Sequence, residues 1–207
     1  ATAFNEVKAT GAKDGSSRTA DQTGYAVWWM EYAEGSVIRL ARQLAAEQRL
    51  PLADTARLFA LLGLSLYDTY VAVWDSKFEF DHWRPYTAIR EASRDDNSAT
   101  DATGDWEPMR PTPPFPEYVS AHAAACAAAF EVIGRVLGDA RTFTMETISA
   151  PAGMPTRRFA SFSAAAMECA DSRVRLGWHF RYSTDAGLVL GRAVADYIVT
   201  RHLAGNE

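Results

Sequence analysis

Apolar residues recur along most of this chain at the three- and four-residue spacing that is typical of amphipathic helices. The segment 52–75 is the longest periodic stretch, and its apolar positions lie nearly all round the helix axis, which predicts a central helix. Strict alternation of apolar and polar residues is nearly absent. The pattern therefore predicts an all-α protein built as a helical bundle. We expect helices starting near Tyr25 and over 37–48, 52–75, 85–90, 120–137, 158–178 and 184–203.

Two segments lack this periodicity. Residues 1–24 are polar and rich in Gly, Ser, Thr and Asp, which predicts an extended N-terminal arm before a helical-bundle domain over 25–207. Residues 94–114 predict a long loop, with four prolines between positions 108 and 114. A loop of this length inside a compact domain is usually functional or flexible, and this one leads directly into a candidate site.

Composition excludes several classes of protein. The chain has 207 residues, enough for one sizeable core, and ordinary apolar and charged fractions. A net charge of −5 argues against a nucleic-acid-binding protein. No uninterrupted apolar run reaches the roughly 18 residues that span a bilayer, so we expect no transmembrane segment.

The two cysteines, Cys126 and Cys169, both lie among small residues on predicted helices. Free cysteine packs as a small hydrophobic residue. We therefore expect two buried free thiols, with a disulfide as the less favoured alternative.

Three short stretches carry the groups that a pocket for a tetrahedral oxyanion needs. Arginine supplies forked donors, lysine supplies a point charge, and a helix start supplies free backbone N–H groups. None of the stretches is decisive alone, but their order and spacing together are specific. The three stretches are residues 77–85, which contain Lys77 and Arg84; residues 116–122, which contain Ser120, Ala121 and His122; and residues 172–179, which contain Arg173 and His179.

This ordered set resembles the signature of the superfamily of type 2 phosphatidic acid phosphatases and vanadium haloperoxidases. The superfamily pattern is Lys-x6-Arg-Pro, then Pro-Ser-Gly-His, then Ser-Arg-x5-His-x3-Asp. Residues 4–8, 18–23, 83–90 and 113–118 resemble the bacterial haloperoxidases in particular. The resemblance implies the C-terminal half of a fold made of two helical bundles. It leaves a missing N-terminal half or a homo-oligomer as the expected partner.

The resemblance also implies a role for each motif residue. His179 bonds vanadium in the haloperoxidases or attacks phosphorus in the phosphatases, and His122 transfers protons. Lys77 contributes to catalysis by polarising the bound oxidant. Trp74 and Phe115 match positions that line the pocket in related enzymes, although both could equally be core aromatics. The implied oxyanion-binding groups are Lys77, Arg84, Ser120, the Ala121 N–H and Arg173.

Local sequence sets geometric conditions on these roles. Pro85 disfavours a continuous helix through Arg84, so we expect Lys77 at one helix end and Arg84 at the next helix start. Arg173 and His179 lie six residues apart and converge only if their helix ends near Gly177.

The chain departs from the superfamily pattern at two positions. Ala121 stands where the pattern has glycine, which leaves the backbone N–H available. Ser183 stands where the pattern has aspartate. We expect this loss of a carboxylate to weaken the positioning of Arg84 or Arg173, and Ser183 to act instead as the N-cap of the last helix.

Three functions remain open at this point. The favoured one is a vanadate-dependent haloperoxidase that oxidises halide with hydrogen peroxide to hypohalous acid, with phosphate able to occupy the same site. The second is an acid-phosphatase-like phosphomonoesterase that cleaves a phosphate ester through a phosphohistidine. The third is an inactive half-protein that binds anions or a partner bundle. Resemblance to exported bacterial enzymes favours a secreted or periplasmic location.

Overall fold

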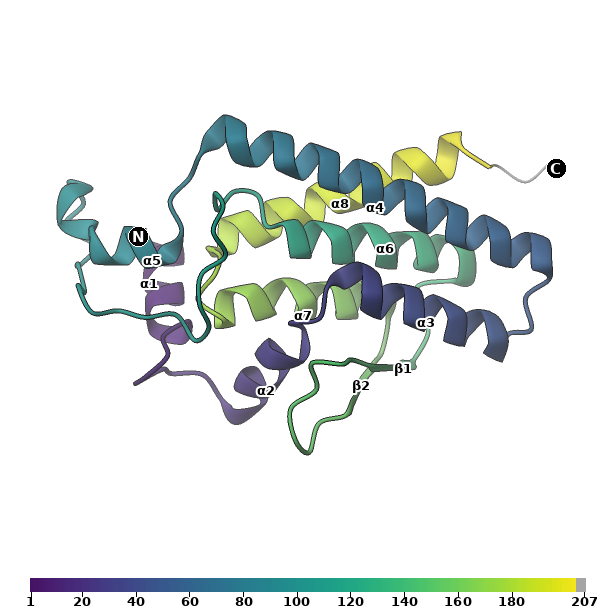
Figure 1. Cartoon of the computed structure of the whole chain (residues 1–207), viewed down its shortest axis with the longest axis horizontal. Helices are drawn as coiled ribbons and strands as arrows, with labels where there is room; N and C mark the ends of the chain where they lie inside the picture. Colours follow the sequence, from purple (N-terminus) through teal and green to yellow (C-terminus); the bar gives the residue numbers. More distant parts are fainter. Residues whose placement is uncertain (204–207) are drawn as a thin grey trace.

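The computed structural model describes residues 1–203 and consists mostly of helices that run side by side (Figure 1). The prediction of an all-α helical bundle is confirmed. The helices are α1 (Thr2–Thr10), α2 (Ala20–Trp28), α3 (Ala33–Glu47), α4 (Leu52–Phe80), α5 (Pro85–Arg90), a 3-10 turn η1 (Ala92–Arg94), α6 (Ala121–Leu137), α7 (Phe162–Arg175) and α8 (Arg181–Arg201); the strands are β1 (Phe143–Glu146) and β2 (Thr156–Phe159).

Helix α6 occupies the centre of the bundle and packs against α8, α7, α4 and α3 (Figure 1). Its small residues from Ala123 to Ala129, all alanine except Cys126, are fully buried, so small side chains face neighbouring helices on all sides. Short side chains allow the helix backbones to approach closely. The N-terminus of this helix, which carries the second motif, is therefore held between α4, α7 and α8.

Helix α8 approaches α6 so closely that two glycines are required. A Cβ atom on Gly191 would lie 2.1 Å from the carbonyl oxygen of Ala124. One on Gly187 would lie 2.8 Å from the carbonyl oxygen of Ser120. This close contact positions the start of α8, just after His179, against the start of α6.

Two regions differ from the elements that the sequence predicts. The segment expected as an extended arm contains α1, because Phe4 and Val7 are buried against Trp106 and Phe180 despite the polar composition around them. The helix expected from residue 158 begins only at Phe162. The residues before it form β2, which pairs with β1 as an antiparallel hairpin over the core.

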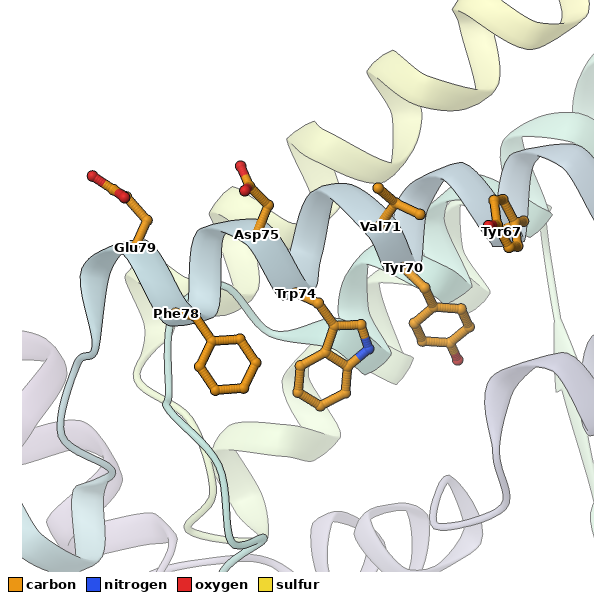
Figure 2. Close-up of a pocket in the computed structure, with 7 residues that line it drawn as sticks. All are labelled: Tyr67, Tyr70, Val71, Trp74, Asp75, Phe78 and Glu79. Atoms are coloured by element: carbon orange, nitrogen blue, oxygen red, sulfur yellow. The ribbon is translucent and has the colours of Figure 1, made fainter.

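Helix α4 carries an aromatic row, and Figure 2 shows Tyr70, Trp74 and Phe78 pointing to one side of the helix, with Tyr67 farther along it. The side chain of Phe78 is 69% exposed. By length and composition alone, the described stretch Leu52–Arg90 could cross a membrane, a property it shares with core helices of globular proteins.

The partner expected for this chain, a missing half or a second copy, stays a prediction.

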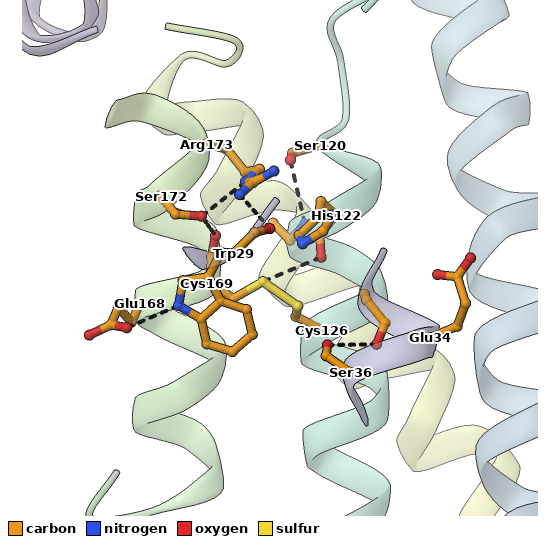
Figure 3. The surroundings of a disulfide bond; sticks show 12 residues. Trp29, Glu34, Ser36, Ser120, His122, Cys126, Glu168, Cys169, Ser172 and Arg173 are labelled. Carbon is orange, nitrogen blue, oxygen red and sulfur yellow. Dashed lines mark hydrogen bonds between the residues drawn. A yellow bond between two sulfur atoms is a disulfide. The ribbon is translucent and has the colours of Figure 1, made fainter. Parts of the chain in front are cut away.

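The prediction of free thiols is wrong. Cys126 of α6 and Cys169 of α7 form a disulfide, which lies in the bundle interior next to His122 (Figure 3). Both helices turn a face of small residues toward each other, which brings the two sulfur atoms together. Sequence alone does not reveal which helix faces meet. The small residues around each cysteine led us to expect buried thiols, but the same residues allow the two helices to approach closely enough for a disulfide.

Reducing this disulfide is expected to lower the free energy of unfolding by about 4 kcal/mol, from the entropy gained by an unfolded loop of this length. The loop spans 43 residues. The measurement is chemical denaturation of oxidised and fully reduced protein, with reduction verified by thiol titration. A Cys126→Ala/Cys169→Ala variant should not respond to the reductant. An unchanged denaturation midpoint on reduction would contradict the prediction.

A half-buried charge network anchors α1 and the start of α8 to α7. Asp171 accepts hydrogen bonds from Tyr25, Arg175 and Arg181, and Arg181 also pairs with Glu6. Burial by itself would raise the pKa of Asp171, but the bonds from Arg175, Tyr25 and Arg181 outweigh it and hold the pKa below its usual value. Arg175 and Arg181 thus both form ion pairs with Asp171.

Asp171→Asn is expected to lower the free energy of unfolding by about 1–3 kcal/mol at neutral pH, because charged bonds are replaced by neutral ones. The carboxylate stabilises the fold above its unfolded pKa of about 3.9. That contribution is lost as pH falls through the lower folded value. The gap between wild type and variant, followed by thermal denaturation against pH, should therefore close below about pH 4. A gap that does not narrow as the pH falls below about 4 would assign the effect to packing.

Candidate functional site

The first motif spans the break between α4 and α5, as its sequence predicts. Lys77 lies in the last turn of α4, and Asp81 ends that helix in the left-handed conformation. Arg84 is the N-cap residue of α5, with Pro85 at the first helical position. The break turns both side chains inward, so Lys77 is fully buried and Arg84 is 6% exposed.

The second motif forms the N-terminus of α6. Ser120 is the N-cap residue, and its hydroxyl accepts from the Ala123 N–H at 3.5 Å (Figure 3). Ala121 and His122 occupy the first turn, whose backbone N–H groups have no partners within the helix. This end of α6 therefore combines free donors with the positive end of the helix dipole.

The third motif converges because α7 ends where the sequence predicts. The helix stops at Arg175, and Gly177 has a φ of +78°, a conformation that favours glycine. The chain then reverses, and this reversal brings His179 back beside Arg173. Both side chains are almost completely buried.

All three motifs border one cavity of about 600 Å³ at this end of the bundle. Arg84, Ala121, His122, Arg173 and His179 lie in its wall. Lys77 and Ser120 lie behind this wall, buried next to residues that line it. The other lining residues, which sequence reasoning missed apart from Trp74 and Phe115, are Met30, Tyr32, Tyr70, Trp74, Pro113, Pro114, Phe115 and Trp178.

The cations are held in place by backbone carbonyl groups of the long loop and its neighbours. The Lys77 Nζ donates to the Pro116 and Glu117 carbonyl oxygens at 2.8 and 3.0 Å. Arg84 Nε donates to the Phe115 carbonyl at 2.9 Å, and Arg173 donates to the Trp29 carbonyl (Figure 3). Neutral carbonyl groups orient these side chains without cancelling their charge.

The aromatic residues complete this cationic wall. The Phe115 ring lies under both cations, 5.3 Å from the Lys77 Nζ and 4.9 Å from the centre of the Arg84 guanidinium. Trp74 meets Phe115 edge to face at 4.9 Å. Cation–π contacts of this kind favour the charged form of each group. Trp74 and Phe115 thus line the cavity rather than the core.

Burial and mutual repulsion destabilise the positive charges in this cluster. Burial, followed by the charge of Arg84, lowers the pKa of Lys77 to about 7. Burial lowers the pKa of Arg84 to about 10 and that of Arg173 to about 9. Burial also lowers the pKa of His179 well below its usual value, and Arg84 adds to this effect. A bound anion would reverse these shifts, because opposite charge favours the charged form.

Two buried polar atoms of the described cavity wall have no partner, although such atoms are usually satisfied in proteins. They are Arg84 Nη2 and His122 Nε2. With the free N–H groups of the α6 start they surround a volume suited to a small anion. The donor set therefore fits a tetrahedral oxyanion such as phosphate or vanadate.

Sequence reasoning missed one charged residue of the site, Glu117. Its carboxylate is fully buried, and Oε1 lies 2.8 Å from Nδ1 of His179. Burial raises the pKa of Glu117 to about 7. The only available signal was its position within the second motif, 62 residues from the histidine.

Ser183 does not play the part that the sequence predicts. Helix α8 begins at Arg181 with Phe180 as its N-cap residue, so Ser183 lies within the first turn. Its hydroxyl lies 3.4 Å from Nδ1 of His179 and contacts neither arginine. The chain reversal at Gly177 lets the helix start earlier than the polar residues suggested.

Comparisons with known proteins identify relatives of this chain. Residues 57–205 match the family described as VCPO second helical-bundle domain. Vanadium chloroperoxidase from Curvularia inaequalis is 36% identical to this chain over 91 residues. The match covers 40% of this chain and 15% of that protein.

Solved structures extend the likeness over nearly the whole chain. A bacterial vanadium-dependent iodoperoxidase matches 97% of this chain with 27% identity and a TM-score of 0.82. A bacterial vanadium-dependent chloroperoxidase matches 99% of this chain with 20% identity and a TM-score of 0.77, a likeness of fold alone. This chain spans about half the length of these two proteins, 49% and 48%.

Proposed function

Because the chain belongs to the family of the VCPO second helical-bundle domain, we propose that it forms the oxyanion-binding part of a vanadate-dependent haloperoxidase. The reaction would oxidise halide with hydrogen peroxide to hypohalous acid. The observation that carries the proposal is the buried cluster of Lys77, Arg84 and Arg173 around a cavity with unpartnered donors beside His179. The iodoperoxidase with the same fold supports this reading at 27% identity.

In this proposal His179 is the metal ligand, through its Nε2 atom. Lys77, Arg84 and Arg173 neutralise the charge of the bound oxyanion. The hydroxyl of Ser120 and the backbone N–H of Ala121 donate the remaining hydrogen bonds. Ala121 needs only its backbone N–H for this role, so the methyl group that replaces glycine is compatible with it.

The chain's own residues would also handle protons. When bound, vanadate supplies a Lewis acid that activates hydrogen peroxide toward halide. Lys77 reinforces that polarisation from behind the cavity wall. His122 faces the cavity with a free Nε2 and a pKa lowered by burial and by Arg173, so it is neutral and able to accept a proton near neutral pH.

One observation also supports phosphomonoester hydrolysis. His179 has Nδ1 bonded to a carboxylate and Nε2 directed away from it, an arrangement that suits a nucleophilic histidine. His122 would then protonate the leaving oxygen, and the cations would stabilise the transition state. Vanadate would inhibit this reaction by occupying the same cavity.

A paired assay separates the two functions. One arm follows bromination of a phenolic dye with peroxide and bromide after loading phosphate-free protein with vanadate. The other arm follows hydrolysis of a phosphate ester without vanadate. Bromination that requires vanadate is the expected result. Hydrolysis that vanadate inhibits, without bromination, would make the protein a phosphatase. No activity in either assay would favour an inactive half-protein.

A further inference from the structure

Glu117 is the carboxylate at the centre of the buried cationic cluster. Its Oε1 atom lies 2.8 Å from Nδ1 of His179 and accepts the Phe180 N–H at 3.0 Å. Its backbone carbonyl accepts from Lys77 at 3.0 Å. One residue thus contacts the histidine, the chain just after it and the lysine of the first motif.

The hydrogen bonds around His179 determine which ring nitrogen carries the proton. Arg84 Nη1 lies 2.9 Å from Nε2 of His179. A guanidinium group can only donate, so Nε2 must be the acceptor. In the neutral ring Nδ1 then carries the hydrogen and donates it to Glu117. The Nε2 lone pair accepts from Arg84 in this structure, so a bond from Nε2 to an anion in the cavity would replace that contact.

The superfamily motif would place a carboxylate four residues after this histidine, where the chain has Ser183. The hydroxyl of Ser183 lies 3.4 Å from Nδ1, beyond the usual range of an N–H···O bond. A carboxylate at the same position would extend farther toward Nδ1. Glu117 already makes that contact, at 2.8 Å and from a different segment of the chain.

We infer that Glu117 is the positioning residue of this site, which holds the proton on Nδ1 of His179 from a segment of the chain remote from Ser183. The inference rests on the oxyanion site proposed above. A carboxylate hydrogen-bonded to a ligating histidine fixes the ring and raises its basicity, and its loss typically weakens metal binding about 10- to 100-fold. Glu117 also offsets part of the charge of Lys77 and Arg84.

The test uses Glu117→Ala and Glu117→Gln, each alone and combined with Ser183→Asp. Affinities for orthovanadate and for inorganic phosphate are measured by calorimetry. The protonated nitrogen of His179 is identified from nitrogen chemical shifts in anion-free protein. Glu117→Ala is expected to weaken vanadate binding about 10- to 100-fold. It is also expected to change the nitrogen chemical shifts of His179, called the histidine signature below. Adding Ser183→Asp should restore both.

The isosteric Glu117→Gln variant separates charge from hydrogen bonding, because its amide oxygen can still accept from Nδ1. We expect the histidine signature to persist while affinity falls. If Glu117→Ala does not fold, Glu117→Gln with and without Ser183→Asp still measures the rescue. Ser183→Ala should lose less than about threefold in affinity, since its hydroxyl makes only long contacts, at 3.4 Å to His179 Nδ1 and 3.5 Å to the Glu117 carbonyl oxygen.

Wild-type affinity and an unchanged histidine signature in folded Glu117→Ala would overturn the inference. So would a Ser183→Ala loss as large as that of Glu117→Ala. Neither readout requires turnover. A wild-type protein that fails to brominate would therefore count against the haloperoxidase, while the histidine signature and phosphate affinity would still test Glu117.

Discussion

His179→Ala is expected to weaken vanadate binding by more than about 100-fold, beyond the effect typical of losing a residue that only orients a ligand. The reason is the position of Nε2, which faces Arg84 and the cavity while Nδ1 is held by Glu117. The other histidine in the cavity wall, His122, lies on α6. The measurement is calorimetric titration of phosphate-free protein with orthovanadate.

Phosphate provides the internal control for this variant. Lys77, Arg84 and Arg173 remain in place, so phosphate held by charge alone should lose far less affinity than vanadate. The ratio of the two affinities therefore isolates the bond to the metal. An unchanged vanadate affinity would remove His179 as the ligand. An equal loss for both anions would mean that the substitution disorders the cavity.

Local sequence signals were sufficient to predict how the cations of the site are placed. Pro85 predicts the break that puts Lys77 and Arg84 on consecutive helix ends, and Gly177 predicts the end of α7. Both residues act through backbone restrictions that depend only on their own identity. The spacing of apolar residues likewise predicts the main helices, because a helix with one buried face carries apolar residues every three or four positions.

The features that the sequence did not predict depend on contacts between distant segments. Glu117 meets His179 across 62 residues, and the disulfide joins positions 43 residues apart. Helix α1 forms in a polar segment because Phe4 and Val7 find apolar partners elsewhere in the chain. In each case the deciding interaction is a tertiary contact, which neither the composition nor the spacing of apolar residues predicts.

His122→Ala is expected to lower turnover about 10²- to 10⁴-fold, the range typical for loss of a general acid or base. Vanadate affinity should change less than about tenfold, because the ring makes no hydrogen bond to the cations or to His179 through its free Nε2. The measurement is kcat for dye bromination together with calorimetric affinity on the same preparation. If the phosphatase assay is the active one, the same comparison applies to ester hydrolysis.

His82→Ala is the matched control, since this exposed histidine packs against Phe80 and Tyr118 and lies outside the cavity wall. It should retain wild-type turnover and affinity. Because His122 also lies beside the Cys126–Cys169 disulfide, thermal denaturation must show that the variant keeps its fold. A folded His122→Ala protein with full activity would remove His122 from the mechanism and leave Lys77 as the remaining candidate for proton transfer, since burial and Arg84 bring its pKa to about 7.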